Sequence, residues 1–106
     1  MKLALAGYGK MGHEVEAAAI ARGHEIVAVF DVDKLLSPEA LKLHAPDAVI
    51  DFTQPDTVVT NVRVCIKAKI PIVVGTTGWD DDVPKVRKMI DEAGIVCVIG
   101  SNFSSV

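Results

Sequence analysis

Short segments in which nearly every residue is apolar alternate along the chain with longer segments that mix apolar and polar residues. A strand that is apolar at successive positions is typical of a parallel sheet with both faces covered, because neither face meets water. The segments that fit this description are residues 2–6, 25–30, 47–51, 70–74 and 95–99. The pattern therefore predicts five strands.

The four intervening segments carry apolar residues three or four positions apart, which predicts amphipathic helices. Gly23 and Gly94 follow the first and the fourth of these segments, as expected for the C-terminal ends of helices. Ser37 and Pro38 open the second, because Ser caps free N–H groups and Pro is tolerated in a first turn. The apolar positions are Met11, Val15, Ala18 and Ala19 in the first segment, Val58, Val62, Cys65 and Ile66 in the third, and Val83, Val86, Ile90 and Ala93 in the fourth.

Strands and helices thus alternate from one end of the chain to the other. Parallel strands joined by right-handed crossover helices form an open sheet with helices on both faces. The chain has 106 residues, 50% of them hydrophobic, which fits a single domain spanning residues 1–106 with its own core. The predicted fold class is α/β, a doubly wound parallel sheet of the Rossmann type.

Composition and charge narrow the possible partners. A net charge of −3, the lack of a basic run and an aromatic content of 5% argue against binding to nucleic acid or an anionic membrane. No apolar run reaches the roughly 18 residues of a membrane span, and Lys10 interrupts the N-terminal apolar stretch, so no signal peptide is expected. Cys65 and Cys97 lie 32 residues apart in apolar segments, which predicts reduced core thiols in a cytoplasmic protein rather than a disulfide or a metal site.

Residues 7–12 read Gly-Tyr-Gly-Lys-Met-Gly, a G-x-G-x-x-G pattern between the first predicted strand and the first predicted helix. Gly7 would allow the tight turn, Gly9 the approach of a pyrophosphate to the backbone, and Gly12 close packing of helix on strand. Asp31 ends the second strand 19 residues after Gly12, where a carboxylate can accept both ribose hydroxyls of an adenosine. These residues predict a dinucleotide site and the strand order 3-2-1-4-5. The alternative is a structural glycine turn beside a surface Asp.

Three more loops follow predicted strand ends, where open α/β sheets bind ligands. They span residues 51–55, 75–78 and 100–104. The glycines of the second loop would let a backbone run close to a flat ring, and its two threonines add hydroxyls and exposed amides. Phe52 and Phe103 could pack near a nicotinamide.

These loops also have a purely structural interpretation, which is compatible with binding. Thr53 or Thr77 would cap a helix, and Pro55 would occupy a first turn. Trp79 is expected to cover the start of the last helix, or else to stack on a ring. The remaining polar candidates neither cluster nor pair, so no catalytic residue and no metal ligand is assigned among His13, His24, His44, Asp47 and Asp51.

The chain resembles the N-terminal domain of dihydrodipicolinate reductases, now called 4-hydroxy-tetrahydrodipicolinate reductases. The resemblance covers nearly the whole chain. It rests on Gly-Tyr-Gly-Lys-Met-Gly at 7–12, Val-Ile-Asp-Phe-Thr-Gln-Pro at 49–55, Val-Val-Gly-Thr-Thr-Gly at 73–78 and Ser-Asn-Phe-Ser at 101–104. The first motif occurs in many dehydrogenases, whereas the other three in this order are far more specific.

The resemblance implies an enzyme of lysine and diaminopimelate biosynthesis, in a family of cytoplasmic homotetramers. The family transfers a hydride from NADH or NADPH to a cyclic dihydropyridine dicarboxylate. By motif, the pyrophosphate would be held by Gly7, Tyr8, Gly9, Lys10, Met11 and Gly12, and the adenine ribose by Asp31. The nicotinamide site would be lined by Gly75, Thr76, Thr77, Gly100, Ser101, Asn102 and Phe103.

The departures from the family pattern qualify these expectations. Family members continue into a second domain with a His-His segment and a Lys that donate the proton and bind the dicarboxylate, and this chain stops before them. Ser101 and Val106 stand where the family usually has Ala and Gly. We therefore expect a part of a longer protein that binds the dinucleotide weakly and does not turn over substrate alone.

Cofactor preference follows from the charges near the ribose acid. Some family members place Arg or Lys directly after that acid, whereas this chain has Val32, with Lys34 two positions further on. Asp31 would repel a 2′-phosphate, while Lys10 would either hold one or be solvated. NADH is expected to bind at least as well as NADPH.

Two other functions stay open at this stage. One is the cofactor domain of another dehydrogenase, such as one acting on aspartate or homoserine, which the second and fourth motifs disfavour. The other is a non-catalytic nucleotide- or redox-sensing module, which would bind its ligand without any partner domain.

Overall fold

The computed structural model describes residues 1–100, so the predicted ligand-binding roles of Ser101, Asn102 and Phe103 lie outside the described residues. Strands and helices alternate as predicted, and two short 3-10 turns precede the third and fourth helices. The elements are β1 (Lys2–Ala6), α1 (Lys10–Ala21), β2 (Glu25–Phe30), α2 (Pro38–His44), β3 (Ala48–Asp51), η1 (Pro55–Thr57), α3 (Val58–Ala68), β4 (Ile72–Val74), η2 (Asp80–Asp82), α4 (Val83–Ala93) and β5 (Cys97–Ile99).

The five strands form one parallel sheet in the order β2-β1-β3-β4-β5. The predicted order 3-2-1-4-5 is therefore wrong in the position of the third strand. That strand pairs with β1, in a register that runs from Leu3 opposite Ala48 to Ala6 opposite Asp51. The glycine fingerprint determines only that β1, α1 and β2 are neighbours. It carries no information about which side of this unit β3 joins.

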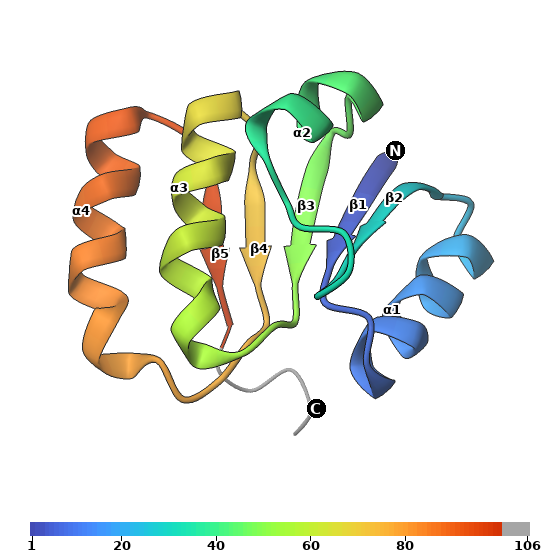
Figure 1. The fold of residues 1–106 in the computed structure, drawn as a ribbon, viewed down its shortest axis with the longest axis horizontal. Coiled ribbons are helices and arrows are strands. Elements are labelled where there is room, and N and C mark those ends of the chain that lie inside the picture. The colour runs from blue at the N-terminus through green and yellow to red at the C-terminus, as the bar shows by residue number, and fades with distance from the viewer. Residues whose placement is uncertain (101–106) are drawn as a thin grey trace.

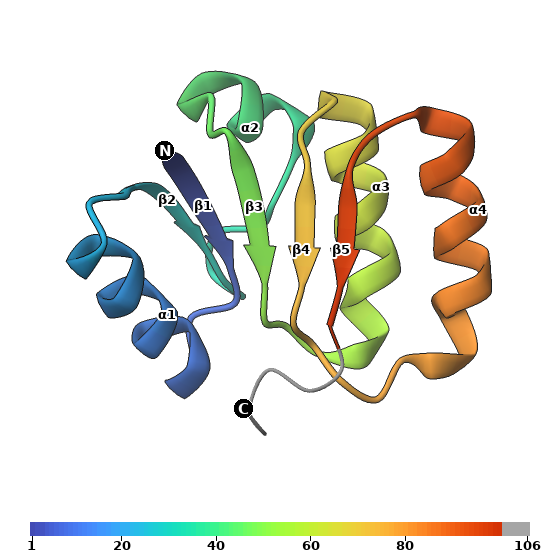
Figure 2. The same ribbon diagram turned by 180° about the vertical axis from the view of Figure 1, so that it is seen from behind.

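The strand order explains how the helices are distributed over the sheet. The chain moves from β1 to β2 in one direction and then crosses back over β1 to β3, β4 and β5 in the other. Since parallel crossovers are right-handed, this reversal puts α1 on one face and α2, α3 and α4 on the opposite face. Figures 1 and 2, which view the sheet from its two sides, show this arrangement.

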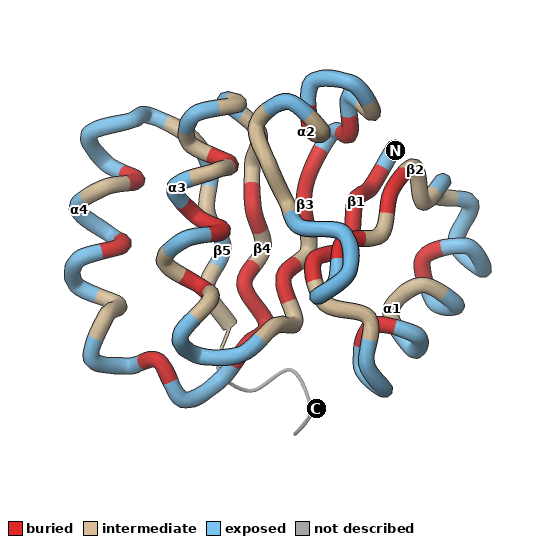
Figure 3. The backbone as a smooth tube through the Cα atoms, in the orientation of Figure 1, coloured by how far each residue is buried: buried red, intermediate tan, exposed pale blue. Residues whose placement is uncertain are grey.

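The main core lies between the sheet and the three helices α2, α3 and α4. Its fully buried members include Leu41 of α2, Val62 of α3 and Val86 of α4, packed with Val49 and Ile72 of the sheet. Among the described residues, a smaller cluster under α1 holds three buried residues, Leu3, Ala19 and Ala48. Buried positions accordingly concentrate in the strands and on the inner sides of the helices (Figure 3).

Several predicted helix ends are confirmed. The Ser37 side chain accepts a hydrogen bond from the backbone N–H of Ala40 at 3.1 Å, and Pro38 is the first residue of α2. Gly94 follows α4 in the left-handed region with φ of 71°. Within the described residues, no helix is long and apolar enough to cross a membrane.

Because Leu41 is the buried residue of the short helix α2, it tests the crossover that carries the chain from β2 over β1 to β3. Leu41→Ala should lower the free energy of unfolding by about 2–5 kcal/mol, since the cavity left behind cannot fully collapse. Leu43→Ala, in the same helix at a side chain that is 80% exposed, should change it by less than about 0.5 kcal/mol. Urea denaturation of both variants measures the difference, and equal losses would contradict the packing of α2.

Candidate functional site

The strand order opens a crevice at the carboxyl ends of β1 and β3. The loop after β1 leads to α1 on one face of the sheet, whereas the segment after β3 leads to α3 on the other. Adjacent strands whose connections diverge in this way leave a gap between them, the usual ligand site of an open α/β sheet. Here the gap is a cavity of about 370 Å³.

Three parts of the chain line this cavity. Gly7, Tyr8 and Gly9 come from the loop after β1, and Asp31 from the end of β2. Phe52 comes from the segment after β3. These five residues were predicted to belong to one site, and the fold brings them together.

The three glycines of the loop differ in what a side chain at each position would meet. Gly7 has a φ of +93°, and a Cβ there would collide with the carbonyl oxygen of Phe52. A Cβ on Gly12 would lie 2.6 Å from the carbonyl oxygen of Gly7, so this glycine lets α1 pack against the loop itself. A Cβ on Gly9, in contrast, would meet nothing within 4 Å. Neither sheet nor helix needs a glycine at position 9, which leaves open space beside the backbone for a ligand.

The start of α1 presents unpaired backbone donors at this open space. Gly9 is the N-cap residue and makes no side-chain capping hydrogen bond, and the first turn holds no acidic residue. The first N–H groups of a helix have no partner within it, and the helix dipole adds a partial positive charge there. Lys10 and Met11 are exposed on this turn and do not line the cavity.

Tyr8 holds the glycine loop against α1. Its hydroxyl donates to Glu16 Oε1 at 2.6 Å, and its ring centroid lies 3.8 Å from that of His13. The hydrogen bond to the Glu16 carboxylate raises the pKa of Tyr8. The phenol is therefore paired with the helix, and the exposed ring of His13 packs against it at an interplanar angle of 38°.

Asp31 stands at the end of β2 in a tight turn. Backbone hydrogen bonds join Asp31 and Lys34 in both directions, at 2.9 and 3.1 Å. The carboxylate is exposed and its Oδ1 accepts from the N–H of Val32 at 2.9 Å, which leaves further lone pairs for a ligand. The Lys34 ammonium lies 5.6 Å from the centroid of the Phe30 ring.

Phe52 links the loops that follow β1, β3 and β4. Its backbone packs on Gly7, and its ring lies where a Cβ of Gly75 would be. Gly75 was predicted to let a backbone approach a flat ring, and the ring that it accommodates is the protein's own. Phe52 thus determines how closely the three loops converge.

Asp51 lies beneath this junction, fully buried. Its Oδ1 accepts from the backbone N–H of Thr53 at 2.8 Å, from the Thr53 hydroxyl at 2.7 Å and from the Thr76 hydroxyl at 2.9 Å. Its Oδ2 accepts from Asn61 Nδ2 at 3.1 Å. Neither Thr53 nor Thr77 caps a helix, so that structural alternative is wrong, although Pro55 does begin the turn η1.

The loop after β4 is only partly open to a ligand. Thr76 is 6% exposed with its hydroxyl turned to Asp51, and its carbonyl accepts from the Trp79 indole at 2.7 Å. Trp79 is buried at the start of η2, as predicted for a residue covering the beginning of the last helix. Thr77 is exposed, and Gly100, which follows β5, donates its backbone N–H to the carbonyl of Val74 at 3.0 Å.

Sequence reasoning missed part of the cavity lining. Thr53 and Asn61 bring polar groups, and Val32 and Leu35, which are 83% and 75% exposed, bring apolar ones. The two exposed apolar residues within four positions after Asp31 could have indicated this part of the lining, because large apolar side chains in a charged turn are unusual. No comparable signal identified Asn61, which lies within α3.

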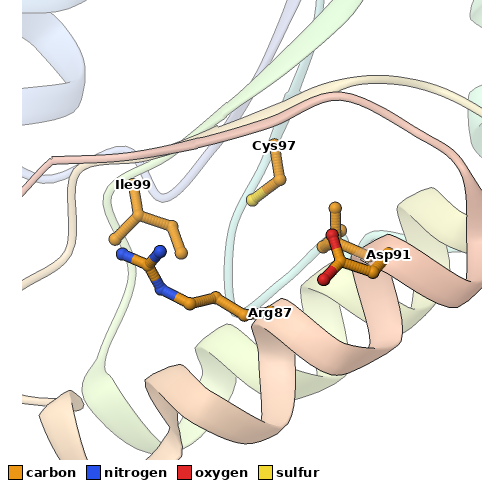
Figure 4. A pocket seen from close by; sticks show the side chains of 5 residues that line it. Arg87, Asp91, Cys97 and Ile99 are labelled. Carbon is orange, nitrogen blue, oxygen red and sulfur yellow. The ribbon is translucent and has the colours of Figure 1, made fainter.

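A second cleft, of about 240 Å³, lies between α4 and β5 at the edge of the sheet. Figure 4 shows Arg87 and Asp91 on α4 facing Cys97 and Ile99 on β5.

Burial raises the pKa of Cys97 and raises that of Cys65 to about 12, so both thiols are protonated at neutral pH. Both cysteines are free, as predicted, and the described residues contain no His, Cys, Asp and Glu group suited to a metal ion.

Comparison with known proteins places this geometry in a family. Residues 1–103 match the family model described as dihydrodipicolinate reductase, N-terminus. The chain is 38% identical over 104 residues to the 4-hydroxy-tetrahydrodipicolinate reductase of Christiangramia forsetii, covering 98% of this chain and 43% of that protein. It is 40% identical over 103 residues to the enzyme of the same name from Beutenbergia cavernae, covering 94% and 40%. The chain thus spans about two fifths of the length of these curated relatives.

Solved structures share the fold. A dipicolinate-bound dihydrodipicolinate reductase from Paenisporosarcina sp. TG-14 superposes with a TM-score of 0.78 at 24% identity, over 99% of this chain and 48% of that one. A hyperthermophilic archaeal homoserine dehydrogenase in complex with NADPH gives a TM-score of 0.73 at 11% identity, over 92% and 43%. Structural likeness at these identities shows the fold alone, whereas the family model and the curated relatives identify the family. The chain belongs to the dihydrodipicolinate reductase family, and it matches the N-terminal part of that family's proteins.

Proposed function

We propose that this chain is the dinucleotide-binding domain of a 4-hydroxy-tetrahydrodipicolinate reductase. The parent reaction is hydride transfer from NADH or NADPH to a cyclic dihydropyridine dicarboxylate. The observation that carries the proposal is the cavity between β1 and β3, with the glycine loop that leads into the start of α1 on one side and the Asp31 carboxylate at one end. A dinucleotide needs both features, because its diphosphate is an anion and its adenosine ribose carries two hydroxyl donors.

The residues present fit such a cofactor. The open space beside Gly9 admits the diphosphate against the backbone of residues 7–12. The free lone pairs of Asp31 accept the ribose hydroxyls, and the exposed side chains of Val32 and Leu35 offer an apolar surface beside them. Two of the proteins that share this fold were solved in complex with NADH or NADPH, a WlbA dehydrogenase and the homoserine dehydrogenase.

The nicotinamide end would lie toward the loops after β4 and β5. Phe52, Gly75, Thr77 and Gly100 are the described residues that meet at this edge of the sheet, with Thr76 holding the loop from inside. A bound dinucleotide supplies the hydride, and the chain supplies position and electrostatics. Ser101, Asn102 and Phe103 remain predicted parts of this end, on the strength of the family motif.

A second domain would complete the site, as the resemblance implies. Among the described residues, no Lys, Arg or His lines the cavity, so nothing there neutralises a dicarboxylate or donates a proton to its ring. The cytoplasmic location and the homotetramer remain predictions that rest on the resemblance.

Gly9→Val tests the diphosphate site. We expect this substitution to abolish NADH binding, because a branched side chain would fill the space that the backbone leaves for the anion. The fold should survive, since a Cβ at this position meets nothing within 4 Å. Titration of NADH fluorescence measures binding, circular dichroism monitors folding, and Ala17→Val on the exposed side of α1 is the matched control. Unchanged affinity for NADH in a folded Gly9→Val protein would contradict the assignment of the diphosphate site to the glycine loop.

The charge of Asp31 should decide between the two dinucleotides. NADH is expected to bind at least as tightly as NADPH, because the carboxylate pairs with free hydroxyls and repels a 2′-phosphate. Asp31→Asn should shift the ratio of dissociation constants toward NADPH, while Asp33→Asn, an exposed residue of the same turn, should shift it less. Isothermal titration calorimetry with both cofactors is the measurement. Wild-type binding of NADPH about tenfold tighter, or 1.4 kcal/mol, would contradict the assignment.

The chain alone should not reduce dihydrodipicolinate at a useful rate. General acid catalysis typically contributes about 10²–10⁴ in rate, and substrate positioning can contribute more. The assay follows NADH oxidation with freshly made substrate, with a full-length family member as reference. Activity within about a hundredfold of that reference would show that this domain already holds the proton donor.

A further inference from the structure

The buried carboxylate of Asp51 has an unusual set of partners. It lies at the carboxyl end of β3, directly under the cavity, and is fully buried. Its hydrogen-bond donors are two hydroxyls, one backbone N–H and one side-chain amide, from Thr53, Thr76 and Asn61. A carboxylate buried in this way is held by neutral donors and links three separate segments, the loop after β3, the loop after β4 and α3.

The chemistry of a carboxylate determines the direction of these hydrogen bonds. Its oxygens only accept, so each hydroxyl next to it must donate its single proton to it. The Thr53 hydroxyl lies 2.7 Å and the Thr76 hydroxyl 2.9 Å from the same oxygen, Oδ1. Once its proton points at Asp51, the Thr53 hydroxyl can act toward any other group only as an acceptor.

The two threonines differ in what they can reach. Thr53 lines the cavity, whereas Thr76 is 6% exposed and its hydroxyl oxygen accepts from the backbone N–H of Thr53 at 2.8 Å. Thr76 therefore touches Asp51 and Thr53 but not the cavity. Thr53 and Asn61 are the partners of Asp51 that also line the cavity, and the Asn61 amide donates to the Thr53 hydroxyl oxygen at 3.5 Å. Of the two, only Thr53 presents a hydroxyl whose direction depends on Asp51.

We propose that Asp51 is a positioning residue of the dinucleotide site, which orients the Thr53 hydroxyl as an acceptor for a hydroxyl of the nicotinamide half of the cofactor. The inference rests on the proposed function. Asp31 and the glycine loop account for the adenosine and diphosphate groups, and Thr53 lines the cavity from the segment after β3, which lies across β1 from the β2 end that carries Asp31. The ribose next to the nicotinamide carries hydroxyl donors, which are the complement of a hydroxyl restricted to accepting.

The test compares the affinities of NADH and ADP for the 106-residue chain. ADP has the adenosine and the diphosphate but no nicotinamide half, so it reports on the part of the site that Asp51 does not serve. Thr53→Val should weaken NADH binding by about tenfold, which corresponds to one lost hydrogen bond of about 1.4 kcal/mol. Asp51→Asn should weaken it in the same direction, because an amide can donate to Thr53 and release the hydroxyl from its acceptor role. ADP should change by less than about twofold in both variants.

The double variant separates positioning from a structural role. If Asp51 acts through the Thr53 hydroxyl, Asp51→Asn should have no further effect on NADH affinity in a Thr53→Val background. Thr53→Ser, which keeps the hydroxyl that Asp51 orients, should retain most of the NADH affinity that Thr53→Val loses, and this pair serves if Asp51→Asn does not fold. Asp47→Asn is the matched control, because Asp47 is exposed just before the other end of β3, where it accepts from the backbone N–H of Lys2 at 2.7 Å.

The outcomes distinguish this inference from the proposed function. A wild-type chain that binds neither ADP nor NADH overturns both. A chain that binds both ligands, but whose Asp51→Asn or Thr53→Val variant weakens ADP as much as NADH, overturns the positioning role alone. A full additional loss of NADH affinity in the Thr53→Val background also overturns it, because Asp51 would then act by another route.

Discussion

The packing of Phe52 between two glycines is the contact on which the site depends. Its carbonyl occupies the space that a side chain on Gly7 would need, and its ring occupies that of a side chain on Gly75. Backbone hydrogen bonds continue the sheet through the same point, since Phe52 N donates to the carbonyl of Ala6 at 2.8 Å and Gly75 N to that of Asp51 at 2.8 Å. The loops after β1, β3 and β4 are thereby held together at the edge of the sheet, beside the cavity.

Hydrogen-bond donors and acceptors occupy different parts of the site. The start of α1 offers donors with a partial positive charge, whereas Asp31 at the end of β2 and Thr53 after β3 offer acceptors. An anion flanked by two hydroxyl-bearing sugars has the complementary pattern. The buried hydrogen bonds around Asp51 belong to this arrangement, because they determine the direction in which the Thr53 hydroxyl points.

The fold and the chemistry are specified at different levels. At 11% identity a homoserine dehydrogenase superposes on this chain almost as well as a dihydrodipicolinate reductase does at 24%. A doubly wound sheet with a glycine loop therefore identifies a way of binding and not a reaction. Membership of the reductase family rests on the match of residues 1–103 to the family model and on the similarity to the curated relatives.

Local sequence by itself determined the elements, several helix ends and much of the glycine loop. Continuous apolar runs, the cap at Ser37 and the left-handed Gly94 depend on neighbours in the chain, and each appears where it was predicted. Only the tertiary structure decided that β3 joins β1 and not β2, because an apolar strand has no local feature that selects its partner. It also decided that the ring against Gly75 is Phe52 and that Thr76 faces inward to Asp51. These contacts join residues more than twenty positions apart, and their geometry follows from how the strands are ordered and how closely the loops approach, which no local pattern encodes.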